Sequence, residues 1–449
     1  MTLNTFLLLS GGNLQNVAGT LGEDIGLCRL WPHLIPRGGL PLRVGRTPGS
    51  PVERTGVLHE RCPQNGPIFR EQMKDDERLL GLRPRTHRRA SQGLPIWKHH
   101  RKVLNPAFNQ QVLDSFIGVF NKQSKKLVKT LSNELGKPLD FSFYLRQSAL
   151  ETICLTAIGL DISDDTDRST NYVKSFEAIM TNFIDRFKRP WLHFDFIYNW
   201  TSYKEKHDKY TKVIVLLFYN NVMSPETKFK PWMDLIFELE EGTFTEKDTR
   251  DEVYTIILAG HESTGAVLTY TFLLIASYEK VQEKILAELE EVLGKEDRDI
   301  TKQDLSRLVY LEAVIKESMR FYPISPFITR FIDKDVQLKN YKLRSGHNCA
   351  LMVYGVHRHP MWGEDAEEFK PERWLDPSTL PANPNAFLAF GAGKRNCIGK
   401  VYAMMSMKII LSHVLRSYRV IGDHTKMKFK LDVMLKPLSG HEITVHKRM

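Results

Sequence analysis

Hydrophobic residues recur at helical spacing along most of the chain after residue 94. In residues 111–135, Leu113, Phe116, Ile117 and Phe120 fall on one face of a helix, and cations occupy the other face. The same criterion predicts further helices over residues 141–160, 247–277, 281–293, 308–321 and 398–417. At ~1.5 Å per residue, the 247–277 helix would span roughly 45 Å, about the width of a large domain.

Strand-like segments are short and few. They lie around residues 328–336 and 350–356, and a proline-rich meander without a period follows over residues 369–384. In residues 165–235 aromatic and charged positions alternate and prolines interrupt them, so no element is defined there. The pattern predicts a mainly α fold with a small β component.

The first part of the chain differs from the rest in composition and periodicity. Residues 31–95 are rich in Arg, Gly and Pro and show no sustained period of 2 or 3.6. Such a segment is either a disordered arm or sequence that never belonged to a fold. We therefore expect an atypical N-terminal segment, 1–93, that is disordered or aberrant, and one folded domain, 94–449.

Composition and charge narrow the function classes. The chain has 449 residues, of which 42% are hydrophobic, so it can bury a sizeable core. The net charge is +10 without an arginine-lysine block, so nucleic-acid binding is not indicated. The basic surface is either merely solvated or a docking face for an acidic electron-transfer partner or anionic lipid. No stretch of about 18 apolar residues predicts a transmembrane helix.

The cysteines are few and scattered. They lack CxxC or zinc-finger spacing, and their odd number argues against a disulfide framework and for a reducing environment. They are Cys28, Cys62, Cys154, Cys349 and Cys397.

Cys397 differs from the others because of its surroundings, Phe390-Gly-Ala-Gly-Lys-Arg-Asn-Cys-Ile-Gly399, directly before an apolar helix. A thiolate is a strong iron ligand, and nearby cations and a helix N-terminus lower the pKa of a thiol. The three glycines supply positive φ and let the backbone approach a flat ligand. Arg395 could hold an anionic group beside the metal. A lone cysteine is usually a core residue, but the pattern Phe-x-x-Gly-x-Arg-x-Cys-x-Gly indicates a ligand.

A second cluster, Ala259-Gly-His-Glu-Ser-Thr264, lies in the middle of the long helix. A glycine inside a helix costs about 1 kcal/mol relative to alanine, so something should compensate for Gly260. Small side chains at 259 and 260 would let a planar cofactor or O₂ lie against the backbone. Glu262 and the hydroxyls of Ser263 and Thr264 could relay protons into that space. Taken alone, the hexapeptide also fits a kinked helix with ordinary polar residues.

Two further patterns pair aromatic, acidic and basic residues. Glu317 and Arg320 lie at i, i+3 on a helix, and Arg373, in a Pro-Glu-Arg segment, adds a second cation. Such a network can be buried if it is fully hydrogen-bonded. Trp97 and Arg101 are four residues apart, which alone is weak evidence.

Together these motifs resemble the cytochrome P-450 superfamily, in the style of the animal microsomal branch that includes fatty-acid ω-hydroxylases. The resemblance runs from about residue 94 to 446 and implies the cytochrome P-450 fold, with the long distal helix and the cysteine loop sandwiching haem b. It implies that Cys397 is the axial ligand of the haem iron. It also implies cofactor contacts from Trp97, Arg101, Arg330, Arg395, Phe390, Ala259 and Gly260.

The resemblance assigns the remaining motif residues as well. Glu262, Ser263 and Thr264 would be catalytic, with Ser263 where the family usually has threonine. The implied structural triad consists of Glu317, Arg320 and Arg373. Ala259 stands where the ω-hydroxylase branch often has a glutamate bonded to haem, so noncovalent haem is expected.

The implied activity is that of a monooxygenase on a hydrophobic organic substrate. Electrons would come from NADPH through a flavin reductase, with a b-type cytochrome as a further partner. The expected location is the cytosolic face of the endoplasmic reticulum membrane, with peripheral membrane contact. Alternatives are a catalytically impaired haem-binding relative and a non-redox isomerase of the same fold, against which Glu262 argues. Microsomal members begin with a membrane helix and a β-sheet, so we interpret residues 32–93 as mis-spliced or frame-shifted, which transcript sequencing would test.

Overall fold

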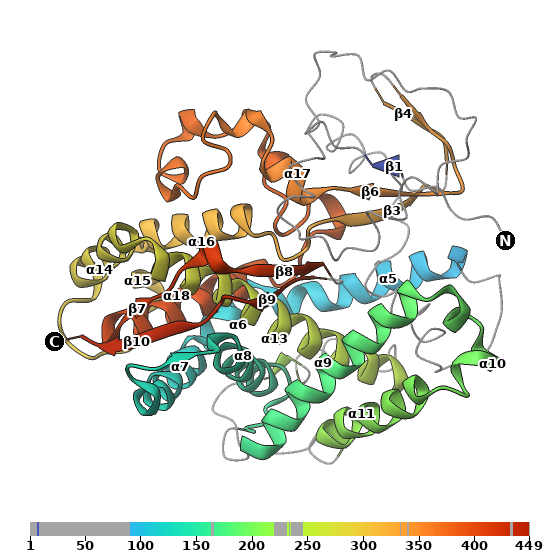
Figure 1. The fold of residues 1–449 in the computed structure, drawn as a ribbon, viewed down its shortest axis with the longest axis horizontal. Coiled ribbons are helices and arrows are strands. Elements are labelled where there is room, and N and C mark those ends of the chain that lie inside the picture. The colour runs from blue at the N-terminus through green and yellow to red at the C-terminus, as the bar shows by residue number, and fades with distance from the viewer. Residues whose placement is uncertain are drawn as a thin grey trace.

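The computed structural model describes residues 7–8, 90–162, 166–219, 231–232, 234, 246–332, 334–338, 341–431 and 434–448. The described part is mainly helical with small sheets, as the hydrophobic pattern predicts (Figure 1). Cys28 and Cys62 lie outside the described residues, as does the atypical segment 1–93 apart from residues 7–8 and 90–93. The helices are α5 (Ala90–Leu104), α6 (Gln110–Ser115), α7 (Ile117–Leu131), α8 (Phe141–Ile158), α9 (Thr166–Lys188), α10 (Asp195–Tyr198), α11 (Ser202–Tyr219), α13 (Glu246–Ser277), α14 (Glu279–Leu293), α15 (Lys302–Arg307), α16 (Val309–Phe321), α17 (Val353–His357) and α18 (Lys400–Ser417).

The long helix α13 runs through the middle of the fold and packs along α8 (Figure 1). Two glycines allow the two helices to approach closely. A Cβ at Gly260 would lie 2.7 Å from Ile153 Cδ1, and one at Gly265 would lie 2.7 Å from Arg146 Cγ. The cost of glycine inside a helix is therefore offset by helix packing at both positions.

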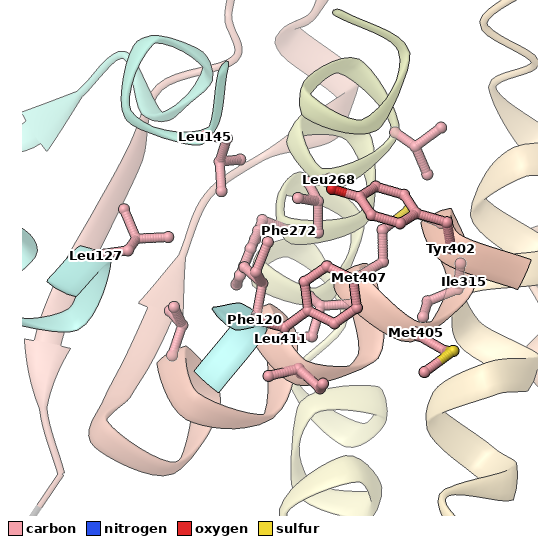
Figure 2. Packing of buried hydrophobic residues seen from close by; sticks show 14 of the residues in the cluster. Phe120, Leu127, Leu145, Leu268, Phe272, Ile315, Tyr402, Met405, Met407 and Leu411 are labelled. Carbon is pink, nitrogen blue, oxygen red and sulfur yellow. The ribbon is translucent and has the colours of Figure 1, made fainter. Parts of the chain in front are cut away.

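One hydrophobic core joins α7, α8, α13, α16 and α18, and Figure 2 shows side chains from these helices meeting in it. Edge-to-face contacts between aromatic rings join pairs of these helices. Phe141 of α8 meets Phe272 of α13 edge to face at 4.8 Å between centroids. Phe120 of α7 meets Tyr402 of α18 in the same way at 5.1 Å. Each fully buried side chain of this size contributes roughly 1.5–3 kcal/mol, so this core fixes the helices that carry the functional motifs.

The strands form small separate sheets: in Figure 1, β3 and β6 lie above the helices at the right, whereas β8 and β9 cross the middle of the view. One sheet has the order β1-β6-β3, with β1 parallel and β3 antiparallel to β6, and another has the order β2-β10-β7. Two hairpins, β4-β5 and β8-β9, complete the set. The strands are β1 (Leu7–Leu8), β2 (Pro138–Leu139), β3 (Ile328–Ile332), β4 (Val336–Gln337), β5 (Lys342–Leu343), β6 (His347–Leu351), β7 (Tyr418–Ile421), β8 (Lys428–Leu431), β9 (Leu435–Ser439) and β10 (Ile443–Lys447).

Three details of the sequence-based expectation need correction. The 111–135 helix is interrupted at Phe116, which ends α6 and precedes α7. The strand around 350–356 ends at Leu351, and Val353 begins helix α17. There Val353 and Val356 are buried in a cluster with Trp362, so packing overrides the β preference of valine. Residues 165–235 contain α9 and α11, which the sequence did not define.

Among the described residues, no helix is long and apolar enough to cross a membrane. The described cysteines Cys154, Cys349 and Cys397 are all free thiols.

Candidate functional site

The cysteine loop is a tight turn that leads into α18. The Cys397 amide donates to Phe390 O at 2.8 Å, and the Gly391 amide donates to Leu388 O at 2.9 Å. Gly391 and Gly393 have φ of 66° and 73°, which side chains disfavour, as the sequence indicates. Gly399 does not follow that expectation, because its φ is −85° and it is the N-cap of α18. A Cβ there would lie 4.0 Å from Cys397 Sγ, an ordinary van der Waals separation, so the protein atoms alone do not require glycine at this position.

The Cys397 side chain can be reached by solvent, but surrounding protein atoms partly desolvate its thiol. Burial raises the pKa of the thiol, and the Gly399 amide and the charges of Arg101 and Lys400 offset only part of the rise. The expectation that nearby cations lower the net pKa is therefore wrong for the free thiol, because desolvation outweighs them. A bound metal ion would deprotonate the thiol outright.

Helix α5 brings Trp97 and Arg101 to this loop. Arg101 Nη1 donates to Asn396 O at 3.1 Å, and Nη2 donates to Asn396 Oδ1 at 3.2 Å. The guanidinium of Arg395 stacks on the Trp97 ring, with Cζ 3.0 Å from the centroid. Three predicted cofactor contacts are thus gathered within reach of Cys397.

Three further contacts involve His100 of α5 and the predicted cofactor residues Arg330 and Phe390. His100 of α5 lies buried against α13, with Nδ1 2.7 Å from Glu252 Oε1, so α5 is held on the long helix. Arg330 lies on β3, where Nη1 donates to Thr329 O at 2.8 Å. Phe390 packs against the main core and lies 5.9 Å from Lys400 Nζ.

The middle of α13 presents an accessible strip. Ala259 is exposed although Leu258 and His261 beside it are buried, and Ser263, one turn later, is partly accessible. Ser263 Oγ donates to Ala259 O at 2.7 Å. Thr264 is buried at 4% exposure, so of the two hydroxyls only that of Ser263 is accessible.

Glu262 points away from this strip. Its carboxylate is buried, and its Oε2 lies 3.9 Å from Arg146 Nε on α8 while its Oε1 lies 3.6 Å from Lys436 Nζ on β9. Burial alone would raise the pKa of Glu262, but the charges of Arg146 and Lys436 outweigh it and hold the pKa below its usual value. Neighbouring His261 is fully buried, and desolvation lowers its pKa, so it is neutral.

Glu317, Arg320 and Arg373 form a buried ionic network. Arg320 Nε donates to Glu317 Oε2 at 2.9 Å, and Arg373 Nε donates to Glu317 Oε1 at 3.0 Å. The two guanidinium groups also donate to backbone carbonyls of residues 357–368. Fully hydrogen-bonded charges of this kind can be buried, and here they hold the segment that leads to the cysteine loop.

Sequence reasoning missed several supporting groups. Trp374 Nε1 and the Lys370 amide both donate to Glu317, at 2.9 Å each. His357 is buried, and its Nε2 accepts from the Leu388 amide at 2.8 Å, just before the loop. Desolvation lowers the pKa of His357 to about 3, so it is a neutral acceptor. Trp374 directly follows Arg373 in the Pro-Glu-Arg-Trp segment. This adjacency is the sequence feature from which its contact with Glu317 could have been predicted.

These groups form a site with one soft ligand and several cations. Among the described residues, no group of three or more His, Cys, Asp or Glu side chains could hold a metal ion. A bound organic group could supply further ligands to a metal at Cys397. Arg101 and Arg395 suit the carboxylates of such a group, because buried carboxylates need charged donors.

Comparison with known proteins agrees with this chemistry. A family model described as Cytochrome P450 matches residues 69–444. The Mus musculus protein Cytochrome P450 4V2 is 32% identical over 380 residues, which cover 78% of this chain and 72% of that protein. The Blattella germanica protein Cytochrome P450 4c21 is 29% identical over 377 residues, covering 78% of this chain and 75% of that protein. These animal relatives confirm the superfamily and the branch that the motifs indicate.

Proposed function

This chain belongs to the cytochrome P450 family, whose members are haem monooxygenases with cysteine-thiolate ligation, and we propose that it inserts one oxygen atom into a hydrophobic organic substrate. The balanced reaction is RH + O₂ + 2 e⁻ + 2 H⁺ → ROH + H₂O. The observation that carries the proposal is the accessible Cys397 thiol, which lies near the charge of Arg101 in a loop where the Cys397 amide donates to the Phe390 carbonyl.

Haem supplies O₂ binding and activation, and the described residues fit it. Cys397 would ligate the haem iron, with Phe390 beside it. Trp97, Arg101, Arg330 and Arg395 would hold the propionates, because charge-assisted hydrogen bonds suit carboxylates. Ala259 and Gly260 would face the ring, and Ala259 has no carboxylate, so the haem is noncovalent.

The proton relay is assigned to the central strip of α13. The Ser263 hydroxyl now donates to the Ala259 carbonyl and can rotate toward the accessible side of the helix. Glu262 would supply protons to it after its carboxylate leaves Arg146 and Lys436. Thr264 is buried beside them and would support the geometry.

Electrons would come from an NADPH-dependent flavin reductase that docks on the surface around the cysteine loop. Lys394 and Lys400 are both exposed there, and a cationic surface attracts an acidic partner. A b-type cytochrome would use the same surface as a second donor.

The proposed membrane contact is an aromatic corner between α9 and α11, at the outer edge of the fold around α10 (Figure 1). We define it by Trp191, Phe194, Phe196 and Trp200, whose exposed fractions are 56%, 49%, 71% and 94%. Such a group of exposed rings on a short projecting turn suits the interface of a lipid bilayer, where Trp is favoured.

The backbone of the aromatic corner supports this assignment. Successive amides are bonded within the turn, among them Ile197 N to Phe194 O at 3.0 Å and Trp200 N to Ile197 O at 3.1 Å. Polar backbone groups must be satisfied internally when they enter an apolar phase. Buried Leu192 and Tyr198 anchor the turn from behind, through Arg186, which donates to Leu192 O at 2.8 Å and lies 3.8 Å from the Tyr198 ring. This contact fits the cytosolic face of the endoplasmic reticulum membrane.

The test is the difference spectrum of the reduced protein with carbon monoxide. Thiolate ligation gives a Soret band at unusually long wavelength. Cys397→Ala should abolish this band, and the matched change Cys154→Ala should keep it. A haem-loaded protein without the band, or an unchanged band in Cys397→Ala, would contradict the proposal.

Turnover is a separate measurement. With reductase and a panel of lipid-like substrates, NADPH consumption should yield hydroxylated product. NADPH consumption without product would favour a catalytically impaired relative, and rearrangement of a peroxide without reductase would favour an isomerase.

A further inference from the structure

Glu262 lies in an ionic cluster that crosses three elements around α13. The cluster comprises Glu262 itself, Arg146 of α8, Glu177 of α9 and Lys436 of β9. Arg146 contacts both carboxylates: its Nη1 donates to Glu177 Oε1, and its Nε lies 3.9 Å from Glu262 Oε2. Two cations thus face two carboxylates, and one of the cations is shared.

The two carboxylates differ in their access to water. The Glu262 side chain is 3% exposed, whereas the Glu177 side chain is 42% exposed, and Arg146 between them is 8% exposed. Arg146 therefore links a buried acid to the surface. The ion pair between Arg146 and Glu177 weakens the attraction of Arg146 for Glu262, because both carboxylates share one guanidinium.

The backbone is shaped to keep Arg146 in this place. Gly265, one turn after Glu262, has no side chain, and a Cβ there would lie 3.0 Å from Arg146 Cα. Arg146 thus enters between α8 and α13 at a position where only glycine leaves room. Helix α9 also reaches α13 directly, because the Tyr172 ring meets His261 at 5.6 Å.

We propose that Arg146 is a positioning residue for Glu262, and that Glu177 on α9 sets how firmly Arg146 holds it. This inference rests on the proposed role of Glu262 in proton relay. Arg146 contacts both carboxylates in the structure, so loss of the Glu177 carboxylate should strengthen its hold on Glu262 and keep that carboxylate away from Ser263.

The first experiment needs no turnover. Arg146→Gln leaves the buried Glu262 carboxylate with Lys436 only, so the melting temperature should fall by several degrees. Adding Glu262→Gln removes the uncompensated charge, so the double variant should melt higher than Arg146→Gln alone. If Arg146→Gln does not fold, Arg146→Lys, which cannot reach both carboxylates, takes its place. A double variant no more stable than the single one would overturn the hold of Arg146 on Glu262.

The second experiment measures turnover of the haem-loaded enzyme with its reductase. Glu177→Gln should lower kcat roughly three- to tenfold, within the range that acid–base catalysis contributes, and raise the solvent deuterium isotope effect. The spectral dissociation constant of the substrate should stay unchanged. The matched control is Asp185→Asn, which removes a carboxylate of α9 that pairs with Arg189 instead.

The outcomes separate the two proposals. Equal behaviour of Glu177→Gln and Asp185→Asn would overturn the role of Glu177. A wild-type chain that turns over no substrate would contradict the proposed function, whereas the melting experiment would still decide whether Arg146 holds Glu262.

Discussion

The guanidinium carbon of Arg395 lies 3.0 Å from the centroid of the Trp97 ring, although the two residues are almost three hundred positions apart in the sequence. A guanidinium over an aromatic face is attracted by the ring, and this contact helps to fix the position of Arg395. Arg395 is therefore held in place before a carboxylate binds. Trp97 contributes to the site by holding Arg395.

Arg395→Ala should weaken haem retention more than Trp97→Phe does. The first change removes a charge-assisted donor to a propionate, and the second keeps an aromatic face for the guanidinium. The rate of haem transfer to a haem-scavenging protein measures the difference. Lys394→Ala, an exposed neighbour, is the control and should leave the rate unchanged. Equal rates for all three variants would contradict a role of Arg395 in haem binding.

Glu317→Ala should be far more damaging than Trp374→Phe. Glu317 accepts bonds from both arginines, the Lys370 amide and Trp374, so its removal orphans all of these donors at once. Breaking a buried ion pair costs about 3–5 kcal/mol, whereas one neutral hydrogen bond contributes about 1 kcal/mol. Thermal unfolding and the yield of haem-loaded protein measure the contrast. A melting temperature of Glu317→Ala equal to that of Trp374→Phe would exclude a central role for the carboxylate.

Gly265→Ala should destabilise the fold by about 1–3 kcal/mol, because its Cβ would lie 2.7 Å from Arg146 Cγ and 3.0 Å from Arg146 Cα. Gly118→Ala in α7 is the matched control, because nothing lies within 4 Å of its Cβ. That change should be neutral or stabilising by up to about 1 kcal/mol. Chemical denaturation curves measure both. The prediction fails if the two alanines shift the midpoint in the same direction by similar amounts.

The pair formed by His441 and Asp140 should contribute stability only in a window of pH. Burial alone would raise the pKa of Asp140, but hydrogen bonds from His441 and Ser142 lower it to about 2. The hydrogen bond to Asp140 raises the pKa of His441, an effect that burial opposes in part.

The directions of these two pKa shifts determine how the stability of the fold changes with pH. The lowered pKa of Asp140 gives a contribution that is present above its unfolded pKa and lost as the pH falls through about 2. The raised pKa of His441 gives a contribution that is complete below its unfolded pKa of about 6.5 and lost as the pH rises through the folded value. The difference in unfolding free energy between wild type and His441→Gln should therefore be largest near pH 4–6. A difference independent of pH would contradict the pairing.

The aromatic corner should determine binding to lipid. Replacing Phe196 and Trp200 by glutamine should weaken binding to phosphatidylcholine vesicles by about tenfold or more, given roughly 1.5–3 kcal/mol for burying one large apolar side chain. Vesicle sedimentation measures this. Leu438→Gln, which is 59% exposed on β9, is the control and should bind as wild type does. Equal losses in both variants would exclude a specific contact.

Sequence periodicity predicted helices in which apolar residues make up most of the buried face, although polar residues such as Glu262 are buried there too. The 247–277 and 281–293 helices agree with α13 and α14 to within two residues. Helix α9 was not defined from the sequence, where aromatic and charged positions alternate, and its buried residues include the polar Asn182 and Arg186. Strand prediction at 353–356 failed because burial against Trp362 decided the conformation of two valines.

The site was predictable where its residues are close in sequence. The cysteine loop and the Glu317–Arg320 pair are local motifs, and the structure places their atoms in contact. The direction of the Glu262 carboxylate was not predictable, because it depends on Arg146 and Lys436, which meet it only through packing of α8 and β9 on α13. The catalytic role of Glu262, Ser263 and Thr264 stays a prediction.

The contact between Arg101 and Asn396 has a consequence for biosynthesis. The two residues are separated by 295 positions, and chains are made at about 5–20 residues per second. Helix α5 thus leaves the ribosome roughly 15–60 s before its partner loop exists. Haem capture must accordingly be a late event, and a nascent chain that stalls between these segments would display Trp97 and Arg101 without the loop that completes their site.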